Sequence, residues 1–100
     1  MMPNKQALNL LGLAKRAGKL ETGEGFVLKA ITKSTAKLVF VAQDASENTR
    51  KKITDKSSFY QVPVQSPFTA AELSDAIGAK RSLIAVTDAG FAQKLIKLLT

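Results

Sequence analysis

Apolar residues recur at helical spacing near the start of the chain. The positions three or four apart are Ala7, Leu8, Leu11 and Ala14. This spacing predicts a helix over about residues 4–17, with Pro3 acceptable in its first turn and Gly18 able to end it in a left-handed conformation. A second helix is expected after a short extended piece at 19–22. Its cap is Thr22, and its inward face is formed by Val27, Leu28 and Ile31.

Continuous apolar runs predict the strands. Residues 37–42, closed by Asp44, and residues 83–87 are rich in strand-forming side chains, as in strands buried on both faces. A further strand is predicted at 59–64, where Pro63 cannot donate a ladder hydrogen bond and so favours an edge position. These runs predict a sheet with two buried central strands.

Polar residues mark the starts of the remaining helices. Asp44 and Glu47 are spaced like a capping box and predict a third helix to about Lys56. Thr69 and Glu72 match the capping box in full and begin a helix that Gly78 ends. Asp88 is expected to cap the last helix, whose inward residues are Phe91, Leu95, Leu98 and Leu99.

This alternation of helices and apolar strands predicts an α/β fold. We expect a three-layer α/β/α sandwich around a small mixed four-stranded sheet. A length of 100 residues, 45% hydrophobic and 23% charged, favours one folded domain spanning residues 1–100.

Two missing residue types narrow the chemistry. The chain has no Cys and no His, so thiolate metal sites, cysteine nucleophiles and the commonest general base are excluded. Asp44 and Asp88 follow strands, where α/β enzymes place catalytic carboxylates, but a helix-capping role explains both. The start of the sequence lacks the apolar run of a signal peptide, and no stretch approaches the ~20 apolar residues of a membrane span. We expect a cytoplasmic monomer that is not an enzyme and has no cofactor, no small-molecule substrate and no membrane association.

The charge is strongly positive and uneven. The chain has fifteen Lys and Arg residues and eight Asp and Glu residues, which gives a net charge of +7. Residues 1–56 hold 11 of the 15 basic residues, so an acidic partner is expected to meet the first half of the chain.

A glycine-containing turn at 22–25 directly precedes the second helix. Free N–H groups and the positive end of the helix dipole favour phosphate or base acceptors there. Lys29 and Lys33 lie one turn apart on the following helix, and nearby basic residues that extend the patch are Lys15, Arg16 and Lys19. The alternative is that the glycines only form a tight connection and the lysines are solvated.

Two further features also have two interpretations. The run Arg50, Lys51 and Lys52 is the densest cluster of charge. A solvated helix face supported by i,i+4 pairs of Lys51 with Glu47 and Asp55 explains it better than a nucleic-acid site. Phe26 is suited either to stacking on a base or to packing in the core.

Segments 23–31 and 36–44 together resemble the kink-turn RNA-binding ribosomal-protein family, which includes the archaeal L-seven-Ae and eukaryotic L-thirty-e proteins. The similarity extends to Val62, Pro63, Leu73 and 83–86. Segments 11–19 and 44–52 look closest to the small bacterial YlxQ-type branch. The resemblance therefore spans almost the whole chain.

In that family the second helix reads sheared G·A pairs through a Gly-x-Asn-Glu-x-x-Lys signature, and a loop before the last strand closes over extruded bases. The resemblance places the glycine at Gly23 and the lysine at Lys29, while the Asn-Glu pair falls on Gly25 and Phe26. The loop corresponds to 78–82 and is basic here. The predicted RNA-binding residues are Lys15, Arg16, Lys19, Gly23, Glu24, Gly25, Phe26, Lys29, Lys33, Ala79, Lys80 and Arg81.

The function that the resemblance implies is non-enzymatic binding of structured, kink-turn-like RNA, with ribosomal RNA among the candidates. Replacement of the Asn-Glu pair removes polar contacts to base edges, so modest selectivity is expected. The alternative from another class is a protein-interaction module that has kept the fold after losing part of the RNA-reading signature. A small phosphoacceptor or hydrolase that uses Asp44 or Asp88 is a third alternative.

Overall fold

The computed structural model describes residues 4–100, so the expectation for Pro3 lies outside the described residues. The elements in order are α1 (Lys5–Arg16), β1 (Leu20–Thr22), α2 (Glu24–Thr32), β2 (Leu38–Val41), α3 (Glu47–Phe59), β3 (Val64–Gln65), α4 (Ala70–Ile77), β4 (Leu83–Val86) and α5 (Ala89–Leu99). The predicted helices and the buried strands at 37–42 and 83–87 are present with differences at some ends, whereas the strand predicted at 59–64 is mostly absent.

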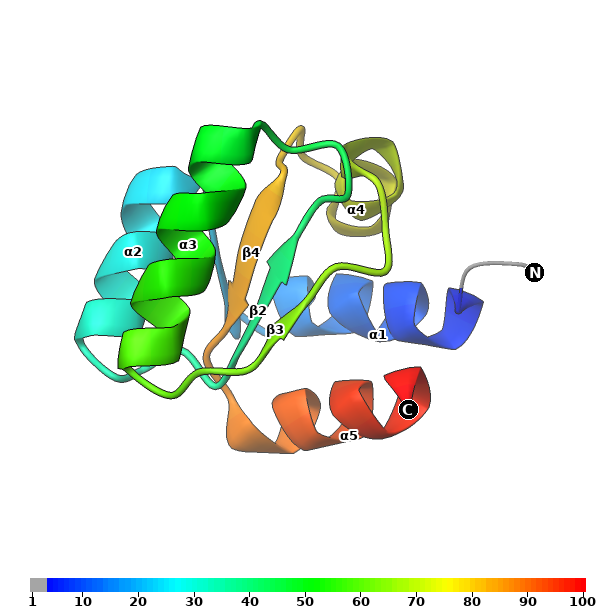
Figure 1. The fold of residues 1–100 in the computed structure, drawn as a ribbon. Helices are drawn as coiled ribbons and strands as arrows, with labels where there is room; N and C mark the ends of the chain where they lie inside the picture. The colour runs from blue at the N-terminus through cyan, green and yellow to red at the C-terminus, as the bar shows by residue number, and fades with distance from the viewer. Residues whose placement is uncertain (1–3) are drawn as a thin grey trace.

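The four strands form one mixed sheet in the order β1-β4-β2-β3. β4 is antiparallel to both β1 and β2, and β3 pairs parallel with β2 at the edge. Figure 1 shows α2 and α3 on one face of this sheet and α1, α4 and α5 on the other. The predicted three-layer α/β/α sandwich around a mixed four-stranded sheet is confirmed.

The side chains on the two faces of the central strands belong to two separate hydrophobic clusters. Every residue of β2 and β4 is buried, as their continuous apolar sequences predicted. Phe40 and Ile84 pack with α1, α4 and α5, whereas Val39 and Ala85 pack with α2 and α3. Because side chains alternate along a strand, each helical layer is held by its own set of strand residues.

The last two helix starts form as predicted. The Thr69 side chain accepts from the N–H of Glu72, and the Glu72 carboxylate accepts from the N–H of Thr69, so the capping box is complete. α4 ends at Gly78, which has a positive φ of 73°. Asp88 caps α5 by accepting from the N–H of Phe91.

The capping box predicted at Asp44 and Glu47 is wrong. Ser46 caps α3 instead, and its Oγ accepts from the N–H of Thr49. Asp44 lies in the turn before the helix and accepts from the N–H of Ala70, 2.8 Å away. It therefore supports the first turn of α4, a contact between segments that the local pattern cannot predict.

The strand predicted at 59–64 is also wrong over most of its length. α3 continues past Lys56 to Phe59, and the chain then turns through Gln61, which has a positive φ of 59°. Only Val64–Gln65 pairs with β2. The edge position inferred from Pro63 is correct, because β3 is the outer strand beside β2.

Candidate nucleic-acid interface

The start of α2 lacks the side-chain cap that the other helices have. Gly23 occupies the N-cap position with φ 91° and ψ 153°, and no side chain there accepts a hydrogen bond. Within residues 4–100, the other four helices have capping side chains at Asn4, Ser46, Thr69 and Asp88. The N–H groups of the first turn of α2 have no acceptor within the helix, so they remain available to an outside acceptor.

Thr22 does not cap α2, which corrects the sequence prediction. Its Oγ1 instead accepts from Nε of Arg81, 3.2 Å away. The cap position falls one residue later, on Gly23, because the positive φ there favours glycine. The N–H of Gly23 donates to the carbonyl of Leu83, which fixes the turn against the start of β4.

Gly25 and Phe26 are both open to solvent at this helix start. A Cβ added at Gly25 would meet nothing within 4 Å, so internal packing does not require glycine there. The Phe26 side chain is 63% exposed. The choice left open by the sequence is thereby settled: Phe26 is not a core residue.

The loop at 78–82 lies against the Gly23 turn. Arg81 connects the two segments through its bond to Thr22, and a Cβ at Gly23 would lie 3.9 Å from Nε of Arg81. The loop is fixed by Ser74, whose Oγ donates to the carbonyl of Arg81 and accepts from its N–H. A guanidinium is therefore held beside the free end of α2.

The other two predicted loop residues differ in their surroundings. Ala79 is half-buried and packs against the α1, α4 and α5 side of the core. Lys80 is exposed and lines a hollow beside α4 together with Arg81 and Ser82. Of the three loop residues, Arg81 is the one the structure places against the α2 start.

Lys52 is a residue of this region that sequence reasoning did not include. Its Nζ lies 2.8 Å from Oε2 of Glu24 in the first turn of α2. The two residues are 28 positions apart, and only the packing of α2 beside α3 brings them together. Lys52 is exposed, as a solvated helix face requires, and it also lies beside the first turn of α2.

The other two members of that run have structural roles. Nη1 of Arg50 donates to the carbonyl of Ala42 at 2.8 Å and to Oγ of Ser66 at 3.1 Å, which ties α3 to the end of β2. Lys51 pairs with Asp55 at 2.9 Å, one of the two i,i+4 partners predicted for it.

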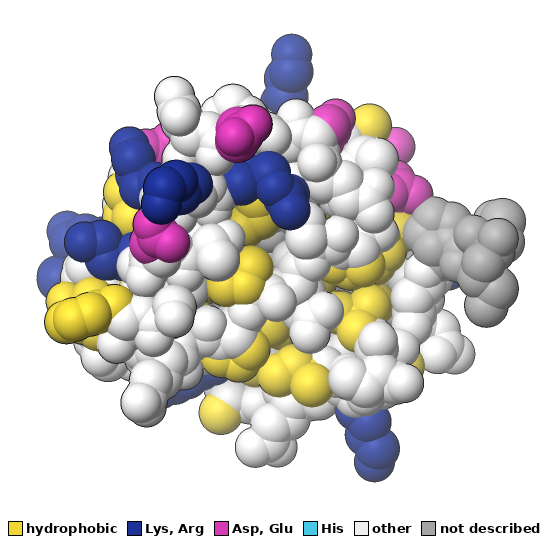
Figure 2. Space-filling view, viewed as in Figure 1, with side chains coloured by type: hydrophobic (Ala, Val, Ile, Leu, Met, Phe, Trp, Pro, Cys, Tyr) yellow, Lys and Arg dark blue, Asp and Glu magenta, His cyan; other side chains and the backbone are white. Residues whose placement is uncertain are grey.

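Lys29 lies on α2, Lys33 directly follows its last residue, and both line a shallow hollow with Glu21 and Phe26. Figure 2 shows that Lys and Arg side chains gather on the side of the molecule formed by α2 and α3, with hydrophobic side chains next to them. The basic character expected of the first half of the chain is concentrated on this side in the view shown.

The structure separates the other basic residues from the Gly23 turn. The carbonyl of Lys19 accepts from Thr87 just before β1, and Thr22 is at the far end of that strand, roughly 10 Å away at the usual strand rise. Lys15 and Arg16 end α1, which lies on the opposite face of the sheet from α2.

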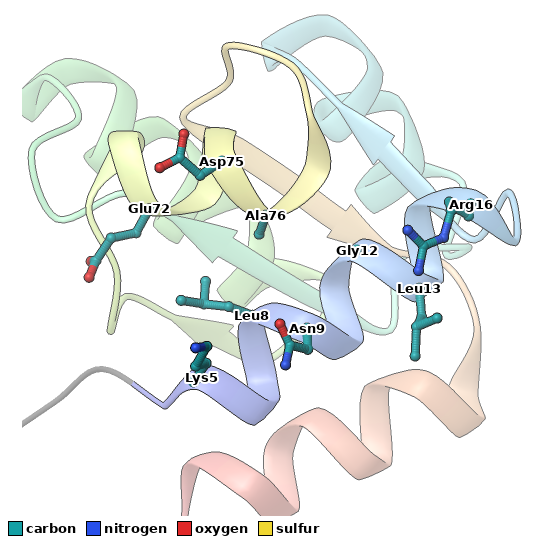
Figure 3. A pocket seen from close by; sticks show the side chains of 9 residues that line it. All are labelled: Lys5, Leu8, Asn9, Gly12, Leu13, Arg16, Glu72, Asp75 and Ala76. Atoms are coloured by element: carbon teal, nitrogen blue, oxygen red, sulfur yellow. The ribbon is translucent and has the colours of Figure 1, made fainter.

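Arg16 belongs to a different surface. It lines a groove of about 550 Å³ between α1 and α4. Figure 3 shows Lys5 and Arg16 at the two ends of α1, with Glu72 and Asp75 on α4. The two helices approach closely at Gly12, where a Cβ would meet the carbonyl oxygen of Ala76 at 2.8 Å. This groove is lined by two basic and two acidic side chains, Lys5, Arg16, Glu72 and Asp75.

Both aspartates considered as catalytic groups have structural partners. Asp88 accepts from Phe91 at the start of α5, and Asp44 accepts from Ala70 at the start of α4. Across residues 4–100 no three acidic side chains gather in a way that could hold a metal ion. None of the helices in the described part is long and apolar enough to span a membrane.

The fold and this site define a class: an α/β/α protein with an uncapped helix start flanked by basic side chains. The chain belongs to the Ribosomal protein L7Ae/L30e/S12e/Gadd45 family, whose model matches residues 5–96. This membership confirms the resemblance found in the sequence.

Named relatives agree with this assignment. The chain is 50% identical over 95 residues to the RNA-binding protein YlxQ of Enterococcus faecium, covering 95% of this chain and 92% of that protein. It is 52% identical over 91 residues to the RNA-binding protein YlxQ of Bacillus subtilis (strain 168), covering 90% and 91%.

Two solved structures have the same fold. A protein of unknown function from Bacillus halodurans C matches with a TM-score of 0.91 at 44% identity, over 94% of this chain and 96% of that one. The Giardia lamblia 15.5kD RNA binding protein matches with a TM-score of 0.80 at 17% identity, over 98% and 92%. At that lower identity the match shows the shared fold alone.

Proposed function

We propose that this protein is a non-enzymatic RNA-binding protein that recognises structured, kink-turn-like RNA at the N-terminus of α2. The observation that carries the proposal is the uncapped start of α2, with Arg81 bound to Thr22 on one side and Lys52 bound to Glu24 on the other. Both YlxQ relatives are named for RNA binding, and neither name refers to a reaction.

The helix start supplies donors suited to RNA. The N–H groups of Glu24, Gly25 and Phe26 point out of the first turn, and their residues are exposed. Phosphate oxygens and base acceptors are the groups that such an end attracts, because the dipole adds positive potential to the free donors. Arg81 contributes a planar donor fork for phosphate or a base edge.

The basic residues around the helix start supply affinity without sequence information. Lys29 lies on α2 and Lys33 at its C-terminal end, and Lys52 lies beside its first turn. Phosphate contacts of this kind position a protein on RNA, whereas base contacts specify the site. We place the centre of the interface at these residues, with Lys80 extending it from the loop.

The departure from the family signature limits selectivity. Gly25 has no side chain and Phe26 has no polar atom beyond its backbone, so neither can make the polar contacts of an Asn-Glu pair. The proposed protein therefore reads mainly the shape of the RNA and its phosphates, through backbone donors and basic side chains. We propose that it does so as a cytoplasmic monomer, with ribosomal RNA among its possible partners.

The test is a titration of the protein with a kink-turn RNA and with a plain duplex of equal length over a series of salt concentrations. About three to five phosphate contacts, each contributing roughly −0.7 to −0.9 to the slope of log K against log salt, are expected. Preference for the kink-turn should be about 1 to 3 kcal/mol, the scale of one good side-chain-to-base contact. Failure to bind either RNA at low salt would reject the proposal and leave a protein-interaction module.

A further inference from the structure

Two aromatic side chains lie on the surface at the end of α3, where the fold does not use them. Phe59 is 79% exposed and Tyr60 is 37% exposed. Their ring centroids are 5.1 Å apart, and the rings meet edge to face at 72°. Each ring holds the other in place, so the pair offers a preformed apolar surface to a ligand.

Lysines lie on the same side of the helix as this aromatic pair. Lys52, Lys56, Phe59 and Tyr60 follow one another at i, i+4, i+7 and i+8, which places them in one stripe along α3. We call these four residues the α3 stripe. They line a shallow hollow of about 410 Å³ together with Asp55.

The charges beside the stripe favour an anionic ligand. Asp55 is paired with Lys51, and Glu24 is paired with Lys52. These are the two ion pairs within residues 4–100, so Lys56 has no acidic partner there. An exposed pair such as Lys52 with Glu24 contributes little to stability, so Lys52 can exchange this carboxylate for a phosphate at small cost.

We infer that the α3 stripe binds unpaired nucleotides that flank the structured RNA, with a base stacked on Phe59 and Tyr60 and the adjoining phosphates at Lys56 and Lys52. This inference rests on the proposed function, since Lys52 joins the stripe to the start of α2. Along α3, Lys52 and Phe59 are roughly 10 Å apart at 1.5 Å per residue. A strand leaving the helix start can therefore reach the aromatic pair.

Exposed aromatic rings next to lysines are the elements of a single-strand binding surface. Every base has a flat face, so stacking tolerates any sequence, and the lysines follow the backbone. An apolar protein partner would satisfy the rings but leave Lys56 without a counter-charge. The combination of rings and cations favours the nucleic acid over such a partner.

The test compares the kink-turn RNA with versions that carry a short run of unpaired uridines at either end. Wild-type protein should bind one extended RNA about tenfold more tightly than the blunt one, within the range expected for one stacked base. Phe59→Ala and Lys56→Ala should remove this gain and leave binding to the blunt RNA unchanged. Matched controls are Leu13→Ala, an exposed apolar residue on the opposite layer, and Lys97→Ala on α5, and both should keep the gain.

A second readout does not depend on any variant. Tyr60 is the single tyrosine and the chain has no tryptophan, so its fluorescence reports on the α3 stripe alone. An oligouridine is expected to quench this emission. Equal binding of blunt and extended RNA by wild type, or a gain that survives in Phe59→Ala, overturns the inference while leaving the proposed function intact. Absence of binding to the blunt RNA rejects the proposed function. In that case, quenching of Tyr60 fluorescence by oligouridine supports binding at the α3 stripe, and unchanged fluorescence overturns it.

Discussion

The starts of α2 and α4 are built in opposite ways. At α4, the Thr69 hydroxyl and the Glu72 carboxylate satisfy one another's backbone donors, so this helix end is closed. At α2, Gly23 offers no side chain and the first turn faces solvent. A capping Thr stabilises a helix start by roughly a few tenths of a kcal/mol relative to Gly at the same position. The chain gives up this contribution at α2, and the free donors are what the proposed RNA interface uses.

The same contrast extends to the neighbours of each helix start. At α4, Asp44 from the preceding loop accepts an additional N–H, so an acidic group already occupies the positive end of the helix. At α2, the arriving side chains are cationic: Arg81 reaches Thr22 and Lys52 reaches Glu24. The backbone donors at the start of α4 are thus satisfied within the protein, whereas those at the start of α2 are free and lie beside two cationic side chains and the Glu24 carboxylate.

The largest change in the difference between the two helix starts is expected when the family's Asn-Glu pair is restored at the start of α2. The double substitution Gly25→Asn and Phe26→Glu should raise the preference for a kink-turn over a duplex by about 1 to 3 kcal/mol, because polar side chains again reach base edges. The space at Gly25 and the exposure of Phe26 allow both changes without loss of fold. Paired titrations, with circular dichroism as the folding control, measure this. Equal discrimination by wild type and variant would mean that backbone donors or the 78–82 loop carry the recognition.

The two glycines of the open end should respond differently to alanine. Gly23→Ala forces a side chain into a positive φ and should lower the free energy of unfolding by about 1 to 3 kcal/mol. Gly25→Ala, in a helical position with no neighbour within 4 Å, should raise it by about 0.5 to 1 kcal/mol. Urea denaturation compares the two. If both variants lost stability equally, Gly25 would have a structural role that its open surroundings do not indicate.

The closed end is broken by Thr69→Ala. Loss of the capping box should lower the free energy of unfolding by about 1 kcal/mol, and RNA affinity should not change because Thr69 is not one of the proposed interface residues. Thermal unfolding and one RNA titration check both halves of this prediction. A parallel fall in RNA affinity would show that the two helix starts are coupled.

The smallest expected effect concerns single lysines. Lys29→Ala should weaken RNA binding more than Lys51→Ala, because Lys29 follows the open helix start whereas Lys51 is paired with Asp55. Loss of one phosphate contact should reduce the magnitude of the salt slope by roughly 0.7 to 0.9. Titrations at several salt concentrations separate the two variants, and equal losses would indicate a diffuse electrostatic surface.

Most of the fold follows from local patterns in the sequence. The runs at β2 and β4 are long and apolar enough to specify buried strands, and Thr69 with Glu72 specifies a helix start without help from the rest of the chain. The patterns failed where a tertiary contact competes with them. Asp44 has the spacing of a helix cap, but its carboxylate accepts a hydrogen bond from the N–H of Ala70 instead. α3 continues to Phe59 because the polar sequence contains no residue that would end the helix before Gln61.

The candidate site was predictable only in part, for the same reason. The glycine turn and the loop at 78–82 were expected from the sequence and its family resemblance, and the bond from Arg81 to Thr22 brings them together. Lys52 was not expected, because its position beside Glu24 depends on α2 and α3 sharing one face of the sheet. Lys15, Arg16 and Lys19 were grouped with the turn by sequence distance, but a strand separates them from it.

The most direct test follows the backbone amides of an open and a closed helix start, those of α2 and α5, by nuclear magnetic resonance while kink-turn RNA is added. The account predicts that the N–H signals of Glu24, Gly25 and Phe26 shift or broaden strongly, whereas those of Ala89 and Gly90 at the start of α5, which Asp88 caps, stay in place. Unchanged signals at residues 24–26 in an RNA-saturated sample would contradict the claim that the open end of α2 is the binding site.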